Sequence, residues 1–426
     1  MTRQYKDSGI EWIGQIPIDW KMQPLAIYFA ENSKSNSDLG SVNALQFKYG
    51  EIIQKPNNGK ELTDKDRELL EKYTVVSPDD IVVNGLNLNY DLKSLRIAKV
   101  REDGIITSAY IVLRPRNGAN ASFYNYYLKA LDFQKIFHGM GVGIRLTLSY
   151  DELRSMLLAV PSFDEQQRIA DYLDKKCAEI DGLIELQEQM IAQLTDYKQS
   201  VITEAVTKGL NPNVEFVPSG VDWIGDVPKG WRIAQTRRIV RNHLQGYYDA
   251  DGYVTSGYRL LRITDLLSNG NLSLENAPFV KETPNIKDFI LQPGDFCFAR
   301  TGGAGNFGFV SEDIEPAVFA SYLIRFRFSG QNNNYLRYYF LSYSFISEVN
   351  SLIHGGVNKN IHAENIKDTH LPLPPLSEQK SIADYLDKEC KEIDDLIAIK
   401  QQKIETLKEY KKSVIFEAVT GKIEIS

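Results

Sequence analysis

Cysteine and histidine are scarce in this chain, and no long apolar run interrupts it. Three cysteines and five histidines occur, and none stands at a spacing typical of a metal site or a catalytic pair. No uncharged stretch approaches the roughly 18 apolar residues of a membrane span. The polar start, Thr2-Arg3-Gln4, lacks the apolar core of a signal peptide. We therefore expect reduced, buried cysteines, no membrane segment and a cytoplasmic protein.

Motifs for nucleotide binding and catalysis are missing as well. The sequence contains no P-loop and no zinc-protease motif. Gly303–Gly308 has the glycine spacing of a dinucleotide-binding loop, but that fold requires a helix directly after the loop. Phe309-Val310 continues instead as a strand. We interpret the segment as a tight hairpin, and we predict no catalytic residue, no metal site and no cofactor site.

A strong excess of basic charge is also absent. The formal net charge is -7. Most of the acidic excess falls on residues 161–209, which leaves the rest of the chain close to neutral. A basic face can coexist with an acidic far side, so this distribution neither supports nor excludes nucleic-acid binding.

An internal repeat is the most informative feature that is present. Ile169–Lys175 reads Ile-Ala-Asp-Tyr-Leu-Asp-Lys and returns as Ile382–Lys388, 213 residues later. Ser8–Gly14 returns in a similar form as Ser219–Gly225. Repeats of roughly 20–50 residues indicate solenoids, whereas a single doubling of a domain and a helix favours internal two-fold symmetry. Such a molecule suits a partner that is itself two-fold, and duplex DNA is one.

Two long helices are predicted, at about 164–207 and 377–420. Both segments lack proline, and their apolar residues repeat every 3.5 residues, as in a coiled coil. Because the copies are joined in one chain, we expect them to pack antiparallel on each other; two separate surface helices, or a coil between molecules, is the alternative. Lys198 and Lys411 fall on the seam and indicate polar edges or a contact with another protein. The predicted seam consists of Leu173, Ile180, Ile184, Ile191, Leu194, Leu386, Ile393, Ile397, Ile404 and Leu407.

The rest of the chain predicts two globular α+β domains, each with a twisted sheet. Strand-like runs occur at Ile81–Val83 and Phe296–Ala299, and amphipathic helices are expected near 122–138 and 333–352. The predicted order is a first recognition domain, a spacer helix, a second recognition domain and a second spacer helix. The corresponding boundaries are 1–160, 161–209, 210–373 and 374–426.

Polar loops rich in glycine and asparagine recur at corresponding places in both halves. They cover 84–93 and 300–308, 139–145 and 355–360, and the segments near 46–60 and 243–259. Their Arg, Lys and Asn side chains have the hydrogen-bond geometry that fits base edges in the major groove. The same residue types also dominate ordinary solvated loops, so the set carries more weight than any member. The candidate DNA-binding residues are Asn87, Asn89, Lys93, Arg96, Arg145, Arg241, Tyr247, Arg259, Arg300, Asn306, Asn358 and Lys359.

Several motifs in a fixed order carry a resemblance to a known family. They are Ser8–Gly14 with Pro17 and Trp20, Gly294–Gly303, Leu371–Gln379, and the helix ends Glu204–Gly209 and Glu417–Lys422. On these motifs the chain resembles, over its full length, the specificity subunit of type I DNA restriction-modification enzymes. The first half departs from the pattern, since Asn84–Asn87 stands where the second half has Arg300–Gly303.

The resemblance implies a noncatalytic targeting subunit of a prokaryotic cell. Each variable domain would read one half of an asymmetric, bipartite site in double-stranded DNA, and the helices would set the spacer. Two modification (methyltransferase) subunits would dock on the helices, and restriction (motor-nuclease) subunits would join them. S-adenosylmethionine, ATP and Mg²⁺ would then bind to those partners. The alternatives are a protein-protein scaffold without DNA contact and a stand-alone enzyme.

Overall fold

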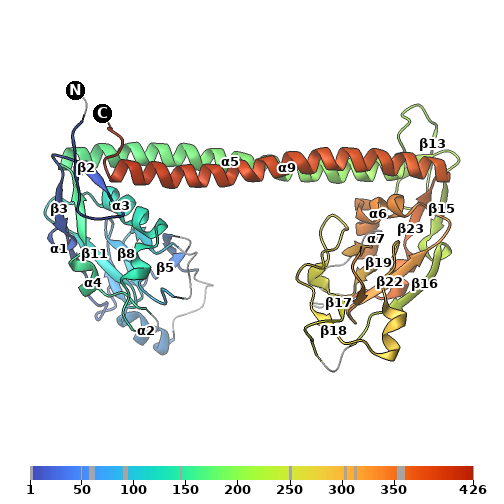
Figure 1. The fold of residues 1–426 in the computed structure, drawn as a ribbon, viewed down its shortest axis with the longest axis horizontal. Helices are drawn as coiled ribbons and strands as arrows, with labels where there is room; N and C mark the ends of the chain where they lie inside the picture. Colours follow the sequence, from blue (N-terminus) through green and yellow to red (C-terminus); the bar gives the residue numbers. More distant parts are fainter. Residues whose placement is uncertain are drawn as a thin grey trace. The chain divides into compact units, whose positions relative to one another are not determined.

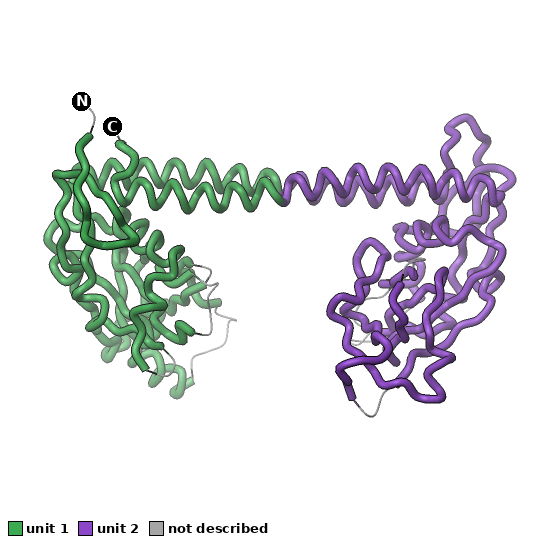
Figure 2. Tube along the Cα trace, in the orientation of Figure 1, with its two compact units in different colours: residues 1–187, 402–426 green, residues 188–401 purple. Residues whose placement is uncertain are grey.

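The computed structural model describes residues 3–48, 50–56, 63–89, 95–143, 146–248, 252–301, 305–310, 314–352 and 360–425. The chain folds into two compact units (Figure 2). Unit 1 consists of residues 1–187 and 402–426, and unit 2 consists of residues 188–401. Each unit therefore combines one globular part with half of each long helix. The four-segment division expected from the sequence stays a prediction about recognition domains and spacers. Four candidate DNA-binding residues lie outside the described residues, namely Lys93, Arg145, Asn358 and Lys359.

The two long helices dominate the fold (Figure 1). Helix α5 spans Phe163–Lys208 and helix α9 spans Leu376–Val419. In unit 1 the start of α5 and the end of α9 share one apolar cluster, and in unit 2 the end of α5 packs with the start of α9. The predicted antiparallel pairing within one chain is therefore confirmed. The predicted seam residues are all buried or half-buried: Leu173, Ile180, Ile184, Ile191, Leu194, Leu386, Ile393, Ile397, Ile404 and Leu407.

Unit 1 is built on an antiparallel four-stranded sheet in the order β4-β11-β8-β9. One face of this sheet packs under α3 and the long helices, and the other face covers a smaller core with Val76 and Ile106. Both faces are buried, which explains the unbroken apolar run Ile81–Val83. The strands are β1 Tyr5–Asp7, β2 Gln15–Pro17, β3 Lys21–Pro24, β4 Phe29–Glu31, β5 Leu45–Lys48, β6 Glu51–Gln54, β7 Thr74–Val76, β8 Ile81–Val83, β9 Ile97–Lys99, β10 Gly104–Ile106, β11 Ile111–Pro115 and β12 Leu157–Val160. The shorter helices are α1 Leu25–Tyr28, α2 Asp64–Glu71, α3 Ala121–Phe133, η1 Ile136–Gly139 and α4 Tyr150–Arg154.

Unit 2 repeats this plan with the sheet β16-β22-β19-β20. Phe296, Phe298 and Phe326 fill the face toward α6, while Cys297 and Leu323 join the core on the other face. The strands are β13 Phe216–Pro218, β14 Asp226–Pro228, β15 Arg232–Gln235, β16 Val240–Gln245, β17 Tyr258–Leu261, β18 Phe279–Val280, β19 Phe296–Ala299, β20 Phe307–Phe309, β21 Ala317–Phe319, β22 Leu323–Phe328 and β23 His370–Leu373. The helices are η2 Thr236–Arg238, η3 Ile263–Asp265, η4 Pro284–Phe289, α6 Asn333–Leu341, α7 Tyr343–Leu352 and α8 Ala363–Asp368.

Glycine closes both long helices in the left-handed conformation. Gly209 has φ +72° and Gly421 has φ +71°, a conformation that a side chain disfavours. A Cβ atom on Gly421 would lie 2.5 Å from Pro17, and one on Gly209 would lie 3.1 Å from Trp231. Gly209 thus ends α5 beside Trp231 of unit 2, and Gly421 ends α9 beside Pro17 of unit 1.

Local structure corrects several sequence-based boundaries. The helix expected at 333–352 is two helices, because Ser342 is extended and its hydroxyl group donates to the Tyr339 carbonyl at 2.6 Å. The segments near 46–60 and 243–259 were expected as loops, yet they contain β5, β6 and part of β16 and β17. Arg241 and Arg259 therefore lie on strands. Strand β16 carries polar side chains because it is an edge of its sheet, paired with β22 alone, whereas β17 lies between β18 and β21.

Candidate nucleic-acid interface

The residues that are alike in the two halves attach each globular part to the long helices. Trp20 Nε1 donates to Glu165 Oε2 at 3.0 Å in unit 1, and Trp231 Nε1 donates to Glu378 Oε2 at 3.1 Å in unit 2. Glu165 lies in the first turn of α5 and Glu378 in the first turn of α9. This contact explains why a tryptophan follows the Ser-Gly motif in each half.

A glutamine on each long helix makes the second attachment. The backbone N–H of Asn120 donates to Gln166 Oε1 at 3.0 Å, and that of Asn332 donates to Gln379 Oε1 at 2.9 Å. The same asparagines cap the short helices α3 and α6 through their side chains. One glutamine therefore fixes the start of a globular helix against a long helix.

A tyrosine–aspartate pair makes the third attachment. Tyr126 Oη donates to Asp174 Oδ1 at 2.7 Å, and Tyr338 Oη donates to Asp387 Oδ1 at 2.6 Å. Burial, together with the neighbouring carboxylate, raises the pKa of both tyrosines above its ordinary value. Each hydroxyl group therefore keeps its proton at neutral pH and stays a donor.

An arginine–aspartate pair braces the main sheet in each unit. Arg114 binds both carboxylate oxygens of Asp80 at 2.9 and 2.7 Å, and Arg327 binds those of Asp295 at 2.6 and 3.0 Å. Each aspartate also accepts the backbone N–H of the residue three positions earlier, and so closes the turn before β8 or β19. The Pro-x-Asp frame shared by the two halves is thus a structural turn.

The candidate DNA-binding residues of unit 1 divide by environment. Asn87 and Asn89 are exposed at the end of the segment after β8. Arg96 is only 2% exposed. Its guanidinium group donates to the carbonyls of Asn84 at 3.1 Å and Leu86 at 2.8 Å, and its backbone N–H donates to Asp132 at 2.6 Å. Burial raises the pKa of Asp132. Arg96 therefore supports, from its buried side, the segment that carries Asn87 and Asn89.

Two candidates of unit 2, Arg259 and Tyr247, are half-buried and contact neighbouring residues of the same unit. Arg259 donates to the Ala277 carbonyl at 2.8 Å and lies 4.1 Å over the Phe279 ring. Tyr247 packs edge-on against Phe289. Residue type suggested base contact for both; the structure adds that each also contacts neighbouring residues of its own unit, and base contact stays a prediction.

Arg241, Arg300 and Asn306 remain at the surface of unit 2, with Arg300 half-buried. Arg300 lines a notch of about 320 Å³ together with His243, Gln245 and His362. His243 stacks on Phe326 at 5.5 Å, and burial lowers the pKa of this histidine. Gln245 and His362 escaped the sequence analysis, because only the pairing of β16 with β22 and the position of α8 bring them beside Arg300.

Three tyrosines of unit 2 are strongly exposed. Tyr248, Tyr253 and Tyr322 are 78%, 65% and 61% exposed. Exposed aromatic rings can stack on bases or lie against a sugar-phosphate backbone. Their exposure could not be inferred from the sequence, since other tyrosines such as Tyr335 and Tyr339 are fully buried.

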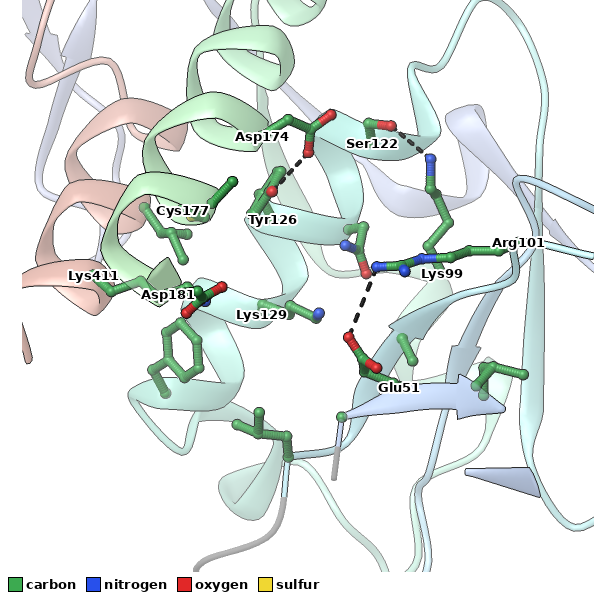
Figure 3. Close-up of a pocket in the computed structure, with 18 residues that line it drawn as sticks. Glu51, Lys99, Arg101, Ser122, Tyr126, Lys129, Asp174, Cys177, Asp181 and Lys411 are labelled. Atoms are coloured by element: carbon green, nitrogen blue, oxygen red, sulfur yellow. Dashed lines mark hydrogen bonds and ion pairs between the residues drawn. The ribbon is translucent and has the colours of Figure 1, made fainter. Parts of the chain in front are cut away.

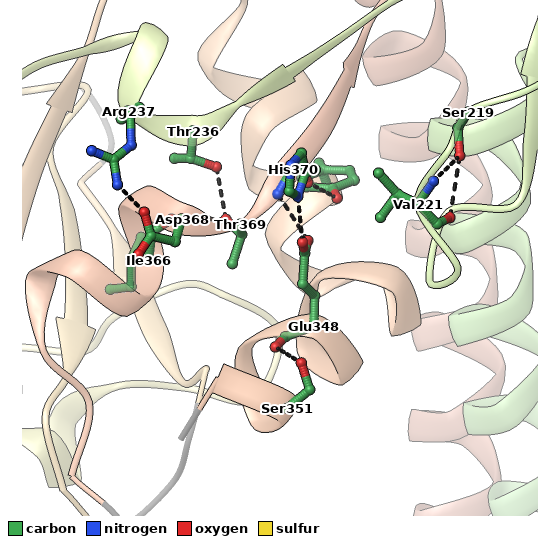
Figure 4. Close-up of polar contacts among 11 residues, drawn as sticks. Ser219, Val221, Thr236, Arg237, Glu348, Ser351, Ile366, Asp368, Thr369 and His370 are labelled. Carbon is green, nitrogen blue, oxygen red and sulfur yellow. Dashed lines mark hydrogen bonds and ion pairs between the residues drawn. The ribbon is translucent and has the colours of Figure 1, made fainter. Parts of the chain in front are cut away.

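Polar contacts join α7 and α8 to neighbouring segments of unit 2 (Figure 4). Glu348 of α7 accepts from the backbone N–H of His370 at 2.8 Å and bonds the His370 ring at 2.6 Å. Arg237 pairs with Asp368 at the end of α8. These contacts fix α7 to β23 and the end of α8 to η2.

No group of His, Cys, Asp and Glu side chains suited to a metal occurs among the described residues. Within the same ranges, no helix is long and apolar enough to cross a membrane. The glycine-rich segment near 303–308 is followed by strand β20, which pairs antiparallel with β19. This geometry is that of a hairpin, as the sequence analysis predicted.

Comparison with known proteins identifies relatives along most of the chain. Residues 257–409 match the model of the type I restriction modification DNA specificity domain. The MjaVIII specificity subunit of a type I restriction enzyme from Methanocaldococcus jannaschii is 25% identical over 83% of this chain and 83% of its own length. The putative MjaX specificity subunit from the same organism is 24% identical over 97% of this chain and 96% of its own length.

Solved structures agree on the fold. One chain, from a study of complex assembly and conformational transition of a type I R-M system, aligns with a TM-score of 0.71 at 14% identity. The alignment covers 96% of this chain and 99% of that one. The HsdS subunit from Thermoanaerobacter tengcongensis aligns with a TM-score of 0.51 at 16% identity, over 96% and 98% of the two chains.

Proposed function

Because the chain belongs to the family of type I restriction-modification specificity subunits, we propose that it selects the DNA sequence on which such an enzyme acts. It is a noncatalytic targeting subunit. Each globular part reads one half of a bipartite, asymmetric target in duplex DNA, and the long helices set the distance between the halves. The proposed subunit acts in the cytoplasm of a prokaryotic cell.

The contrast between attachment and surface carries this proposal. The three attachments to the long helices and the Arg–Asp brace are the same in both units. The exposed candidate residues differ, with Asn87 and Asn89 in unit 1 and Arg241, Arg300 and Asn306 in unit 2. Two globular parts that are attached to the long helices in the same way but differ in their surface residues are expected to read two different half-sites.

The partner subunits dock on the long helices in this proposal. Outside the buried seam, the long helices expose large apolar side chains in each unit. These side chains are Leu183, Leu186 and Tyr410 in unit 1, and Leu396, Ile399 and Tyr197 in unit 2. These residues occupy equivalent positions of the repeat. Two equal apolar surfaces fit two copies of one partner, the methyltransferase subunit. Motor-nuclease subunits add to that assembly, and S-adenosylmethionine, ATP and Mg²⁺ bind to the partners.

The decisive experiment is the methylated motif produced by the chain with its methyltransferase partner. Arg300→Gln should relax or weaken the half-site read by unit 2 and leave the other half-site intact, since a bidentate arginine contributes about 1–3 kcal/mol of base discrimination. Arg232→Gln, an exposed arginine on β15 of the same unit, serves as the control and should leave the motif unchanged.

Three results would contradict the proposal. An equal change of both half-sites in Arg300→Gln would mean that the two units do not read separately. A change of motif in the Arg232→Gln control as large as that in Arg300→Gln would remove the evidence for base reading by Arg300. A complex that forms without binding any DNA would make the chain a protein-protein scaffold.

A further inference from the structure

A cavity of about 540 Å³ lies in unit 1 between the globular part and the long helices (Figure 3). Its walls come from α3, the strands β6 and β9, and both long helices. The volume is within the range of about 300–1,000 Å³ that small-ligand sites occupy. The lining includes no candidate DNA-binding residue, so the cavity belongs to none of the surfaces described above.

Most charged groups of this cavity are already paired. Lys411 Nζ binds both carboxylate oxygens of Asp181 at 2.7 Å. Asp174 accepts the Tyr126 hydroxyl group. Lys99 donates to the Ser122 hydroxyl group at 2.7 Å, and Arg101 faces Glu51 at 3.8 Å. These contacts use the acidic side chains of the wall.

Two polar groups on one face of α3 lack a partner within the described part of the chain. Lys129 points into the cavity (Figure 3) and has neither an ion pair nor a hydrogen bond through Nζ. Asn125, one turn earlier on the helix, is 9% exposed, and its Oδ1 atom is buried without a hydrogen bond. Lys129 itself is half-buried, and this partial burial lowers the pKa of its ammonium group. A buried polar atom without a partner, such as Asn125 Oδ1, destabilises the folded state.

The second half fills these two positions differently. The repeat aligns Tyr126 with Tyr338, so that Asn125 corresponds to Arg337 and Lys129 to Leu341. Arg337 lies within 4.0 Å of Asp387 and over the Tyr338 ring. Unit 2 thus replaces the two unpartnered groups by a paired arginine and an apolar side chain. The pair of unpartnered groups is specific to unit 1.

We propose that this cavity binds a small oxyanion of the hydrogen-phosphate or phosphate-monoester class. One anionic oxygen accepts from the Lys129 ammonium group, and a protonated oxygen of the same ligand donates to Asn125 Oδ1. A ligand that offers both an acceptor and a donor satisfies both groups at once. Because the walls come from the globular part and from both long helices, the bound ligand stabilises their contact within unit 1.

Calorimetric titration and thermal unfolding of the full chain with inorganic phosphate test this proposal, at constant ionic strength and with chloride as the reference salt. Phosphate should bind and raise the unfolding temperature, since a ligand that binds only the folded state stabilises it. Lys129→Met should weaken phosphate binding at least about tenfold, whereas Lys129→Arg should retain it because the cation is kept. Sulfate, which carries no proton at neutral pH, should bind more weakly than phosphate.

Two variants separate ligand binding from damage to the fold. Lys129→Met without phosphate should unfold at no lower a temperature than the wild type, because the substitution replaces a partly buried, unpaired ammonium group by an apolar side chain. Lys176→Met is the matched control, since Lys176 lies on α5 of the same unit but pairs with Glu179. This control should bind phosphate like the wild type.

The proposal fails if the wild type and Lys129→Met bind phosphate equally, because the cavity would then hold only water. It also fails if Lys176→Met loses phosphate binding to the same extent as Lys129→Met. Addition of duplex DNA distinguishes two sources of the oxyanion. Phosphate that stays bound in the DNA complex supports a free ligand. Phosphate displaced by DNA would overturn that assignment, because the cavity would then receive a backbone phosphate.

Discussion

Arg96 determines the position of the surface segment after β8 in unit 1. Its guanidinium group binds the carbonyls of Asn84 and Leu86 from the buried side, and the exposed Asn87 and Asn89 follow directly. The base-reading candidates of this unit therefore depend on a residue that does not itself reach the surface. Asn87 adds a constraint, because its φ of 51° is a conformation that asparagine tolerates better than most residues.

We predict that Arg96→Met weakens recognition of the half-site read by unit 1 and leaves the other half-site unchanged. The free energy of unfolding should fall by about 1–3 kcal/mol, because buried carbonyls lose their donor. Urea unfolding and the methylated motif of the complex measure the two effects. Arg67→Met is the control, since Arg67 is exposed on α2. Unchanged stability in Arg96→Met would contradict this role.

Residue chemistry could be predicted from the sequence, whereas residue environment could not. Arg96, Arg259 and Arg300 carry the same donors, and all were candidates for base contact. Only the fold separates them, since Arg96 is buried under a loop and Arg259 lies over an aromatic ring, whereas Arg300 borders a surface notch. Base contact by Arg300, Arg241 and Asn306 stays a prediction.

At the scale of elements, the long helices were predictable because their signal is local and periodic. A seam of 3.5-residue spacing specifies a coiled coil, and the repeat specifies its partner. The break at Ser342 could not be inferred, because it depends on how α6 and α7 pack on the sheet. Strand β16 was missed for a related reason, since a polar edge strand resembles a loop in sequence.

The exposed apolar residues of the helices predict how partners dock. Leu183→Glu should remove one methyltransferase copy, and Leu396→Glu the other, with a loss of affinity of about tenfold or more because a buried, unpaired carboxylate costs over about 1.4 kcal/mol. Native mass spectrometry of the reconstituted complex counts the copies. Ala192→Glu, at an exposed position of α5, should keep both. Loss of both copies from either single variant would show that the two surfaces are not independent.

At the scale of the whole molecule, the two helices are matched in length by equivalent ion pairs. Lys411 binds Asp181 in unit 1, and Lys198 binds both carboxylate oxygens of Asp394 at 2.7 Å in unit 2. Asp181 and Lys198 are 17 residues apart on α5, and Asp394 and Lys411 are 17 residues apart on α9. The seam lysines, expected to mark polar edges or a protein contact, thus pair across the helices. Any change in the length of one helix must be matched in the other.

The proposed spacing role of the long helices leads to a prediction about paired insertions. One heptad inserted after Gln187 of α5 and another after Lys400 of α9 should lengthen each helix by roughly 10 Å. At about 3.4 Å per base pair, the preferred spacer should grow by about three base pairs while both half-site sequences stay the same. A heptad in α5 alone should instead destabilise the chain, because the helices would no longer match.

Rotation limits how well the longer molecule can work. Three base pairs turn the second half-site by about 100°, given about 10.5 base pairs per turn, whereas one heptad turns a straight helix by only about 20° against the seam. The paired insertion should therefore methylate its longer target more slowly than the wild type methylates its own. Methylome sequencing gives the motif and the spacer, and a time course on a duplex of each spacer gives the rate. Altered bases in either half-site, or an unchanged spacer, would rule out the helices as the ruler.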